Sequence, residues 1–196
     1  QPIFVRGLEL GRSFVQPRYW GKRSLDYLWV GIGAFVAKNP EYRYLFGPVS
    51  ISNTLPTAAK NLLINYYQHY FSSEQTLAKA KIPFLLDDLE KDQLLSTFKG
   101  DDKDKDFTTM KHLLANLGVG VPTLYKQYSA LCTDGGVSFS AFNIDPDFND
   151  CVDGLVVVDL DKLLPKKRQR YIETHIETHM PTPIETPIPT SKPTTA

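Results

Sequence analysis

The sequence ELGRSFVQPRYWGKRSLDYLWVGIGAFVAK, residues 9–38, decides the fold of this chain. Its first residues are typical of a β-strand, and Pro17 leads into a basic turn at residues 18–23. Apolar residues then recur every three or four positions, which predicts an amphipathic helix over residues 24–38 with Ser24 at its N-cap. A strand that ends in a basic, glycine-containing turn before a helix brings backbone N–H groups, a helix N-terminus and cationic side chains together. This arrangement is typical of a phosphate-binding site.

The rest of the chain predicts an α/β fold. Strands expected at residues 3–15 and 42–52 flank the helix, and the crossover of such a β-α-β unit implies that the two strands are parallel. The charged run at 99–106 is interpreted as a solvated linker, because it lacks the glycine and distal glutamate of a calcium-binding loop. Further helices are expected at residues 56–71, 74–80, 87–97, 108–116 and 122–131, and further strands at 137–144 and 155–160.

Composition narrows the class of protein. The chain has 196 residues, of which 42% are hydrophobic, enough for one core. Lys and Arg number 22, as do Asp and Glu, so the basic bias of a nucleic-acid-binding protein is missing. No apolar run is long enough to span a bilayer, and no signal-peptide pattern is present, which favours a cytoplasmic location with peripheral contact to the inner membrane as an alternative. Cys132 and Cys151 are expected to be free thiols, and no metal is expected.

Three blocks of sequence resemble one bacterial family. They are ELGRS (residues 9–13), YRYLFGPVSISN (42–53), and FNIDPDFND (142–150) followed by DGLVVVDL (153–160). In this order they are similar to the family known as hemolysins or ornithine-lipid-type N-acyltransferases. The resemblance implies a GCN5-related acyltransferase-like mixed sheet flanked by helices. It also implies transfer of a 3-hydroxyacyl chain from acyl carrier protein to the α-amino group of an amino acid, in the synthesis of an ornithine-lipid-like aminolipid.

The resemblance also suggests how the chain is divided. The resemblance covers about residues 3–172, and the first predicted strand of the chain corresponds to the middle of the superfamily fold. Residues 1–172 are therefore expected to be a C-terminal fragment of an acyltransferase domain that lacks its first strands. An inactive fragment is compatible with this interpretation. Residues 173–196 form a tail rich in proline and threonine, which is expected to be disordered.

The basic turn has the form Arg18-x-x-Gly21-x-Arg23, which resembles the pyrophosphate loop of the superfamily. Arg18, Gly21, Lys22, Arg23 and Ser24 are therefore the candidate ligands of a phosphate. Arg23 stands where the superfamily usually has a second small residue, and its side chain hinders a full adenosine diphosphate group. This favours the single phosphate of phosphopantetheine on acyl carrier protein over CoA, while a solvated basic connection is an equally weighted interpretation.

The candidate catalytic groups lie in the strand before this turn. A carboxylate in an apolar strand is costly unless it is used or paired, so Glu9 is a candidate for deprotonating the acceptor amine. Arg12 is either its structural ion-pair partner, through a bulge at Gly11, or a ligand of the acceptor carboxylate. The similar Glu-x-x-Arg of acyl-homoserine-lactone synthases favours the catalytic interpretation. Backbone N–H groups of Phe14 and Val15 are expected to polarise the thioester carbonyl.

Weaker candidates for binding the acceptor follow later in the chain. Ser50, Ser52 and Asn53 end the second predicted strand, near the point where donor and acceptor are expected to meet. Asp145 and Asp147, together with Asp150 and Asp153, cluster in an acidic loop of a family block and are candidates for binding the acceptor's cation, although turn formation explains these aspartates equally well.

Two further classes of function compete with the transferase. The first is a non-catalytic module of the same fold that binds acyl chains or acyl carrier protein. The second is a membrane-lytic protein, suggested by the hemolysin label, but the apolar pattern gives it no support. Within the enzyme class, an acyl-CoA-dependent N-acyltransferase is a close alternative.

Overall fold

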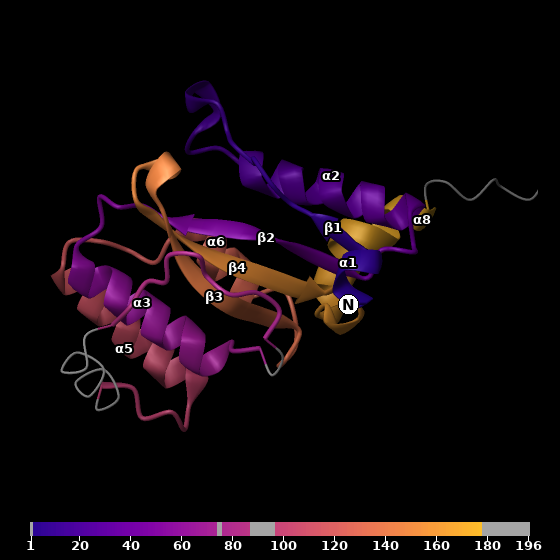
Figure 1. Ribbon diagram of the computed structural model, residues 1–196. Coiled ribbons are helices and arrows are strands. Elements are labelled where there is room, and N and C mark those ends of the chain that lie inside the picture. Colours follow the sequence, from indigo (N-terminus) through magenta and orange to yellow (C-terminus); the bar gives the residue numbers. More distant parts are fainter. Residues whose placement is uncertain (1, 74–75, 87–96, 178–196) are drawn as a thin grey trace, which may run out of the picture.

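The computed structural model describes residues 2–73, 76–86 and 97–177. Figure 1 shows these residues folded around one sheet. In chain order, the helices, short helical turns (η) and strands are α1 (Pro2–Val5), β1 (Gly7–Glu9), η1 (Pro17–Tyr19), α2 (Ser24–Lys38), β2 (Tyr44–Ile51), α3 (Thr57–Tyr70), α5 (Lys103–Asn116), α6 (Thr123–Ser129), β3 (Val137–Asp145), η2 (Pro146–Phe148), β4 (Cys151–Asp159), η3 (Leu160–Lys162), α7 (Pro165–Arg168), η4 (Gln169–Glu173) and α8 (Thr174–Glu177).

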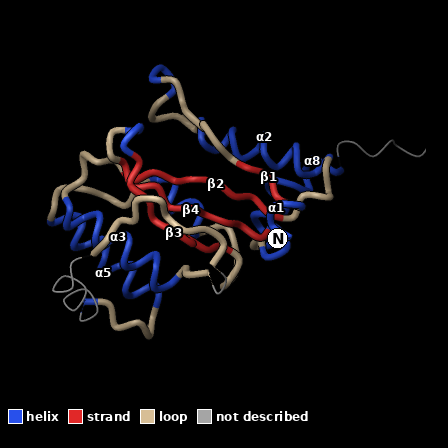
Figure 2. Tube along the Cα trace, viewed as in Figure 1, coloured by secondary structure: helices blue, strands red, loops and turns tan. Residues whose placement is uncertain are grey.

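The sheet has four strands in the order β1-β2-β4-β3 (Figure 2). β1 and β2 are parallel and joined through α2, as the predicted β-α-β unit requires, whereas β4 runs antiparallel to both of its neighbours. The sheet is therefore mixed and flanked by helices, which confirms the predicted α/β class and is consistent with an acyltransferase-like fold.

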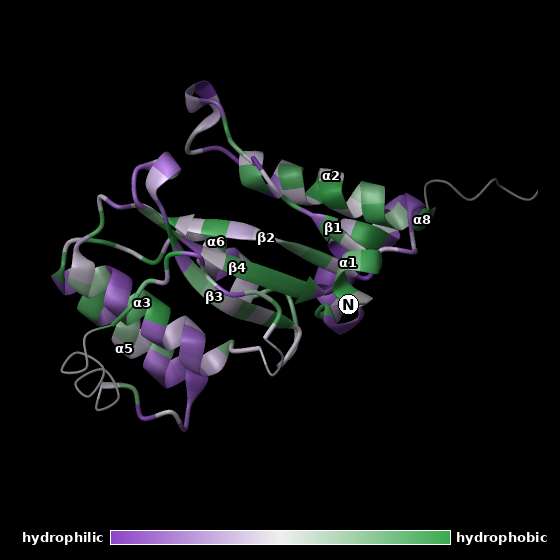
Figure 3. Cartoon of the chain, viewed as in Figure 1, coloured by the Kyte–Doolittle hydropathy of each residue, from purple (hydrophilic) through white to green (hydrophobic). Residues whose placement is uncertain are grey.

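The hydrophobic core covers one face of the sheet. Along β2, Leu45, Val49 and Ile51 are buried, while Pro48 and Ser50 between them are exposed, as expected when successive side chains point to opposite faces. Helices α2, α3 and α6 contribute aromatic rings to this core, and Figure 3 shows the apolar residues that α2 carries. The opposite face of the sheet carries the more polar residues, and the candidate site uses both faces.

The predicted strand at residues 3–15 is wrong over most of its length. The chain forms a helical turn at Pro2–Val5, and β1 has only three residues, Gly7–Glu9. Ser24 is also not the N-cap of α2. The helix starts at Ser24 itself, and the serine hydroxyl donates a hydrogen bond to the Tyr19 carbonyl oxygen at 2.9 Å instead.

Two other predicted segments differ for identifiable reasons. Residues 76–80 are not helical, and just beyond them the backbone of Ile82 lies along β3, where its carbonyl accepts a hydrogen bond from the Ile144 N–H. The predicted linker at 99–106 contains the start of α5, because the Asp102 carboxylate caps that helix by accepting from the N–H groups of Asp104 and Lys105. Nearly all of the predicted helix at 87–97 lies outside the described residues.

The C-terminal segment packs on α2. Helical backbone continues past the expected boundary at residue 172 to the end of α8 at Glu177. Asp26 on α2 binds this segment through Arg170 at 2.6 Å and the Tyr171 hydroxyl at 3.1 Å. Residues 178–196, which include most of the predicted disordered tail, lie outside the described part of the chain.

A buried carboxylate ties the end of α3 to the start of α5. Asp106 accepts hydrogen bonds from the Tyr70 hydroxyl at 2.5 Å and from the Gly100 N–H at 2.9 Å. Burial acts to raise the pKa of Asp106, but these hydrogen bonds outweigh it and hold the pKa below its ordinary value of 3.8. A lowered pKa in the folded state means that the carboxylate stabilises the fold above about pH 4, and that this contribution is lost as the pH falls further.

We therefore expect Asp106→Asn to lower the free energy of unfolding by about 2 kcal/mol at pH 7, because charge-assisted hydrogen bonds are lost. The difference from the wild type should shrink below about pH 4, where the wild-type carboxylate becomes protonated. Urea unfolding at several pH values measures both effects. Asp104→Asn, at an exposed position of the same helical turn, is the matched control and should change stability by less than about 0.5 kcal/mol. Equal effects of the two substitutions would contradict this account.

Candidate functional site

β1 and β2 part at a defined point. The last hydrogen bond between them joins the Leu10 N–H to the Phe46 carbonyl at 2.7 Å. Gly47 permits this approach, because a Cβ there would lie 2.5 Å from the Leu10 carbonyl oxygen. The backbone N–H and C=O groups of Tyr44 and Phe46 point toward β1, and every second residue of β2 does the same, so those of Pro48 would also point toward β1. Proline has no N–H group, so the hydrogen-bond ladder between the two strands cannot continue there. The chain after Leu10 therefore separates from β2.

A cavity of about 510 Å³, which we call the strand-end cleft, lies where the two strands separate. Val49 and Ser50, neighbours on β2, both line it although they point to opposite faces, so the cleft passes around the end of the ladder. Its walls come from residues 10 and 12–15 after β1, from Leu25, Leu28, Trp29 and Ile32 of α2, from 48–50 of β2, from Leu124 and Tyr128 of α6, and from Asp145, Phe148 and Asp153 of the β3–β4 hairpin.

The polar mouth of the cleft is held by the sheet. Asp153 on β4 is paired in register with Ser50 on β2 and Asn143 on β3. The Ser50 hydroxyl donates to Asp153 Oδ1 at 2.6 Å, and Asp145 ends β3 beside the same mouth. Neither Asp145 nor Asp153 has an ion-pair partner in the part of the chain that the structure describes.

Arg12 also lines the cleft, from the chain that follows β1. Its backbone has a positive φ of 55°, a left-handed conformation that costs a non-glycine residue roughly 1 kcal/mol. The change of chain direction that was expected as a bulge at Gly11 therefore falls at Arg12. The Arg12 side chain is exposed, lines the cleft and forms no ion pair with Glu9 or any other described residue. The Glu9–Arg12 ion pair considered from the sequence is absent here.

Glu9 does not line the cleft. It is exposed and pairs in register with Phe46, so it shares a sheet face with Ser50 but lies four β2 positions away, about 13 Å along the strand. Phe14 and Val15 do line the cleft. Their backbone N–H groups donate no hydrogen bond to other described residues, which leaves them available to a carbonyl oxygen in the cleft.

The basic turn lies beside the N-terminus of α2. Gly21 has φ +71°, a conformation that favours glycine, and the Arg18 guanidinium stacks 4.7 Å from the Tyr19 ring centroid. Lys22 lies 5.9 Å from the same ring, so these two cations stand together without an ion-pair partner among described residues. Arg23 instead binds Asp26 at 2.8 Å. The hydrogen bond to Asp26 raises the pKa of Arg23, and the carboxylate partly neutralises the charge of the guanidinium group.

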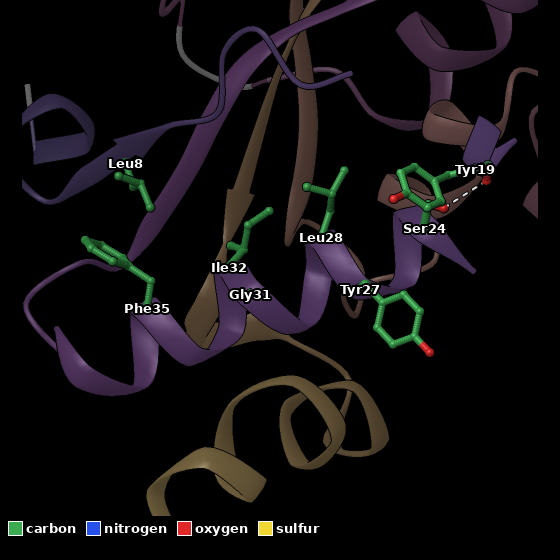
Figure 4. A pocket seen from close by; sticks show the side chains of 8 residues that line it. All are labelled: Leu8, Tyr19, Ser24, Tyr27, Leu28, Gly31, Ile32 and Phe35. Carbon is green, nitrogen blue, oxygen red and sulfur yellow. Dashed lines mark hydrogen bonds between the residues drawn. The ribbon is translucent and has the colours of Figure 1, made fainter. Parts of the chain in front are cut away.

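An open apolar groove joins this turn to the cleft. The groove, about 660 Å³, runs along α2 between Tyr19 and Ser24 at one end and Phe35 at the other. Figure 4 shows Leu28 and Ile32 pointing toward the strands while Tyr27 points away. Leu28 and Ile32 line both the groove and the cleft, so the two hollows adjoin along this helix.

The remaining sequence candidates lie outside the cleft. Asn53 accepts a hydrogen bond from Lys60 Nζ at 2.8 Å, and the Ser52 hydroxyl is 2.8 Å from that of Thr54. Asp147 is exposed, and its N–H donates to the Asp145 carboxylate at 3.0 Å. These contacts are those of local turns.

Two aromatic residues that the sequence analysis did not single out also line the cleft. Trp29 donates from its indole N–H to Gln127 Oε1 at 3.1 Å, and its ring packs edge-on against Tyr128. Burial raises the pKa of Tyr128 to about 12, so its hydroxyl keeps its proton at neutral pH. Both residues belong to apolar helical patterns that predict only a hydrophobic core. The separation of β1 from β2, which the sequence does not reveal, is what places part of this core beside a cavity.

The described residues contain neither a metal-binding cluster nor a membrane-spanning helix. No group of three or more His, Cys, Asp or Glu side chains is placed to hold a metal ion. No helix in residues 2–73, 76–86 and 97–177 has the length and apolar character needed to cross a membrane.

A mixed α/β sheet whose parallel strands part around a cleft beside a basic helix N-terminus fits the acyltransferase class. Comparison with curated proteins agrees. The chain is 27% identical over 174 residues to the glycine N(alpha)-acyltransferase of Bacteroides thetaiotaomicron, covering 85% of this chain and 51% of that protein. It is 25% identical over 174 residues to the glycine N(alpha)-acyltransferase of Phocaeicola vulgatus, covering 85% and 52%.

These matches support an acyltransferase family for the chain, which spans about half the length of the two relatives. No protein-family model and no solved structure matches it.

Proposed function

We propose that this chain carries the transfer site of an N-acyltransferase that moves an acyl chain from a phosphopantetheine thioester to the α-amino group of an amino acid. The observation that carries the proposal is the strand-end cleft, which has an apolar wall on α2, free backbone N–H groups on another side and carboxylates at its mouth. The names of the two relatives support an N-acyltransferase and make glycine the first acceptor to test.

In the proposed reaction the amine nitrogen attacks the thioester carbonyl carbon. A C–N bond forms, the C–S bond breaks, the amine gives up a proton, and the thiol leaves. The N–H groups of Phe14 and Val15 would stabilise the negative charge on the carbonyl oxygen. Glu9 remains the proposed final proton acceptor, and because it does not line the cleft the proton would have to pass to it along a chain of several water molecules.

The proposed donor is acyl carrier protein. Arg18 and Lys22 are available for one phosphate, whereas Arg23 is held by Asp26 and offers little to a second. The acyl chain, a 3-hydroxyacyl group by the family resemblance, would lie in the apolar groove along α2. The product would be an aminolipid precursor, and this accords with a cytoplasmic enzyme working near the inner membrane.

The basic turn provides a test of donor binding. We expect Arg18→Ala to raise KM for the acyl-carrier-protein donor about 10-fold, because one charge-assisted contact to phosphate is lost. The kcat should change little, since the arginine does not touch the reacting atoms. Lys38→Ala is the matched control, because it removes an exposed cation from the far end of the same helix. Equal KM values for the two variants would contradict the assignment of the phosphate to this turn.

Free-thiol release measures the activity itself. Incubating the chain with 3-hydroxyacyl carrier protein and glycine should release thiol and form the N-acyl amino acid, and acyl-CoA should compete poorly. Binding of acyl carrier protein without thiol release for any amino acid would favour the alternative of a non-catalytic binding module.

A further inference from the structure

We propose that the strand-end cleft recognises its acceptor as a zwitterion, with Arg12 binding the carboxylate and Asp153, supported by Ser50, binding the ammonium group. The inference rests on the proposed function and deepens it: the acceptor must carry a free carboxylate, so simple amines and amino-acid amides are poor ligands. It assigns Asp153 a role in binding and no part in bond making.

Opposite charges stand on different walls of one cavity. Arg12 comes from the chain that leaves β1, and Asp153 comes from β4, yet both line the same space of about 510 Å³. Neither side chain has an ion-pair partner among the residues that the structure describes. A cation and a carboxylate that share a cavity without pairing to each other leave room for a ligand with both charges.

The two groups are positioned differently, and each position suits its proposed role. Asp153 sits on a strand bonded on both sides, and the Ser50 hydroxyl fixes one of its oxygens at 2.6 Å. Its other oxygen carries no hydrogen bond from a described residue, and the residue is half-buried and lines the cleft, so this oxygen can accept from an ammonium group. Asp145 adds a second negative charge at the same mouth.

The backbone of Arg12 sets the direction in which its side chain leaves the main chain. The left-handed conformation at φ 55° is unfavourable for arginine, yet it turns this side chain toward the cleft. A guanidinium group binds a carboxylate with two parallel hydrogen bonds, which fixes orientation as well as charge. An amino acid bound at both ends would present its nitrogen on the side of the sheet where Ser50 and Asp153 lie.

The proposal is tested by the binding of glycine and glycinamide, which differ in the carboxylate that Arg12 would recognise. Titrations of the full chain followed by NMR, with the indole N–H of Trp29 as a reporter inside the cleft, give both dissociation constants without any acyl donor. We expect glycine to bind about 10-fold more tightly than glycinamide. Arg12→Gln should abolish this preference and leave glycinamide binding unchanged, while Asp153→Asn should weaken both ligands about 10-fold.

Two control variants match these substitutions. Arg6→Gln removes an exposed arginine just before β1, and Asp150→Asn removes an exposed aspartate from the same hairpin as Asp153, and neither residue lines the cleft. Both should keep the wild-type preference. Equal binding of glycine and glycinamide to the wild type, no binding of glycine, or a preference that survives Arg12→Gln would each overturn the inference.

The outcomes separate this inference from the proposed function. Thiol release without dependence of the preference on Arg12 would keep the transferase and remove the zwitterion site. A preference set by Arg12 and Asp153, without thiol release from any donor, would keep the site and remove the transferase.

Discussion

Replacing Leu28 with tryptophan should reduce acyl transfer about 100-fold or more while the chain remains folded. Leu28 points from α2 toward the strands and lines both the groove and the strand-end cleft, so a larger indole at this position would occupy the space proposed for the thioester (Figure 4). The side chain is 38% exposed, which leaves room for the ring without overpacking the core. The measurement is kcat/KM for thiol release, with circular dichroism and urea unfolding to establish the fold.

An exposed residue farther along the same helix supplies the control. Lys38 lines neither the cleft nor the groove, so Lys38→Trp adds the same ring to α2 outside the proposed transfer site and outside the space proposed for the acyl chain. Activity should stay within about twofold of the wild type. The location of the reaction would be wrong if Leu28→Trp were as active as Lys38→Trp.

The second large effect is expected on stability. Gly33 lies against the C-terminal helical segment so closely that a Cβ would be 1.8 Å from the Tyr171 carbonyl oxygen and 2.6 Å from its carbonyl carbon. Because backbone cannot swing aside as a flexible side chain does, Gly33→Ala must displace this segment. Buried contacts of Ile172 and the packing of Tyr171 near Trp29 would then be lost. We expect a loss of about 3 kcal/mol in the free energy of unfolding.

Gly31 is the matched control on the same helix. A Cβ at Gly31 would meet no atom within 4 Å, so Gly31→Ala should stabilise the chain by about 0.5–1 kcal/mol through the higher helix propensity of alanine. Urea unfolding of the two variants measures whether the free energy of unfolding falls for Gly33→Ala and rises for Gly31→Ala. If both substitutions changed stability in the same direction by similar amounts, the packing described here would be incorrect.

The elements with strong periodicity could be predicted from the sequence. The helix at 24–38 has the predicted bounds, and its crossover correctly implied parallel β1 and β2. The predictions failed where a tertiary contact decides the local structure. Pairing along β1 stops after Leu10 because Pro48 on the neighbouring strand cannot donate a hydrogen bond, and nothing within residues 3–15 encodes that partner.

The candidate site was predictable only in part. Arg12, Phe14 and Val15 lie far from Ser50 and Asp145 in the sequence, and the structure brings all five to one cleft. Glu9 was chosen because a carboxylate in an apolar strand is costly, but the strand ends at Glu9 and the side chain is exposed, so that cost does not arise. The importance of Asp153 depends on its register with Ser50, which the sequence alone does not specify.

The central claim is that the thioester lies in the strand-end cleft with its phosphate at the basic turn. A crystal structure of the chain with a non-reactive thioether analogue of acyl phosphopantetheine tests this most directly. The account predicts the thioether sulfur between Val15 and Ser50, the acyl chain along Leu28 and the phosphate at Arg18. An analogue bound elsewhere, for example in the hollow beside Lys103 and Cys132, would contradict it.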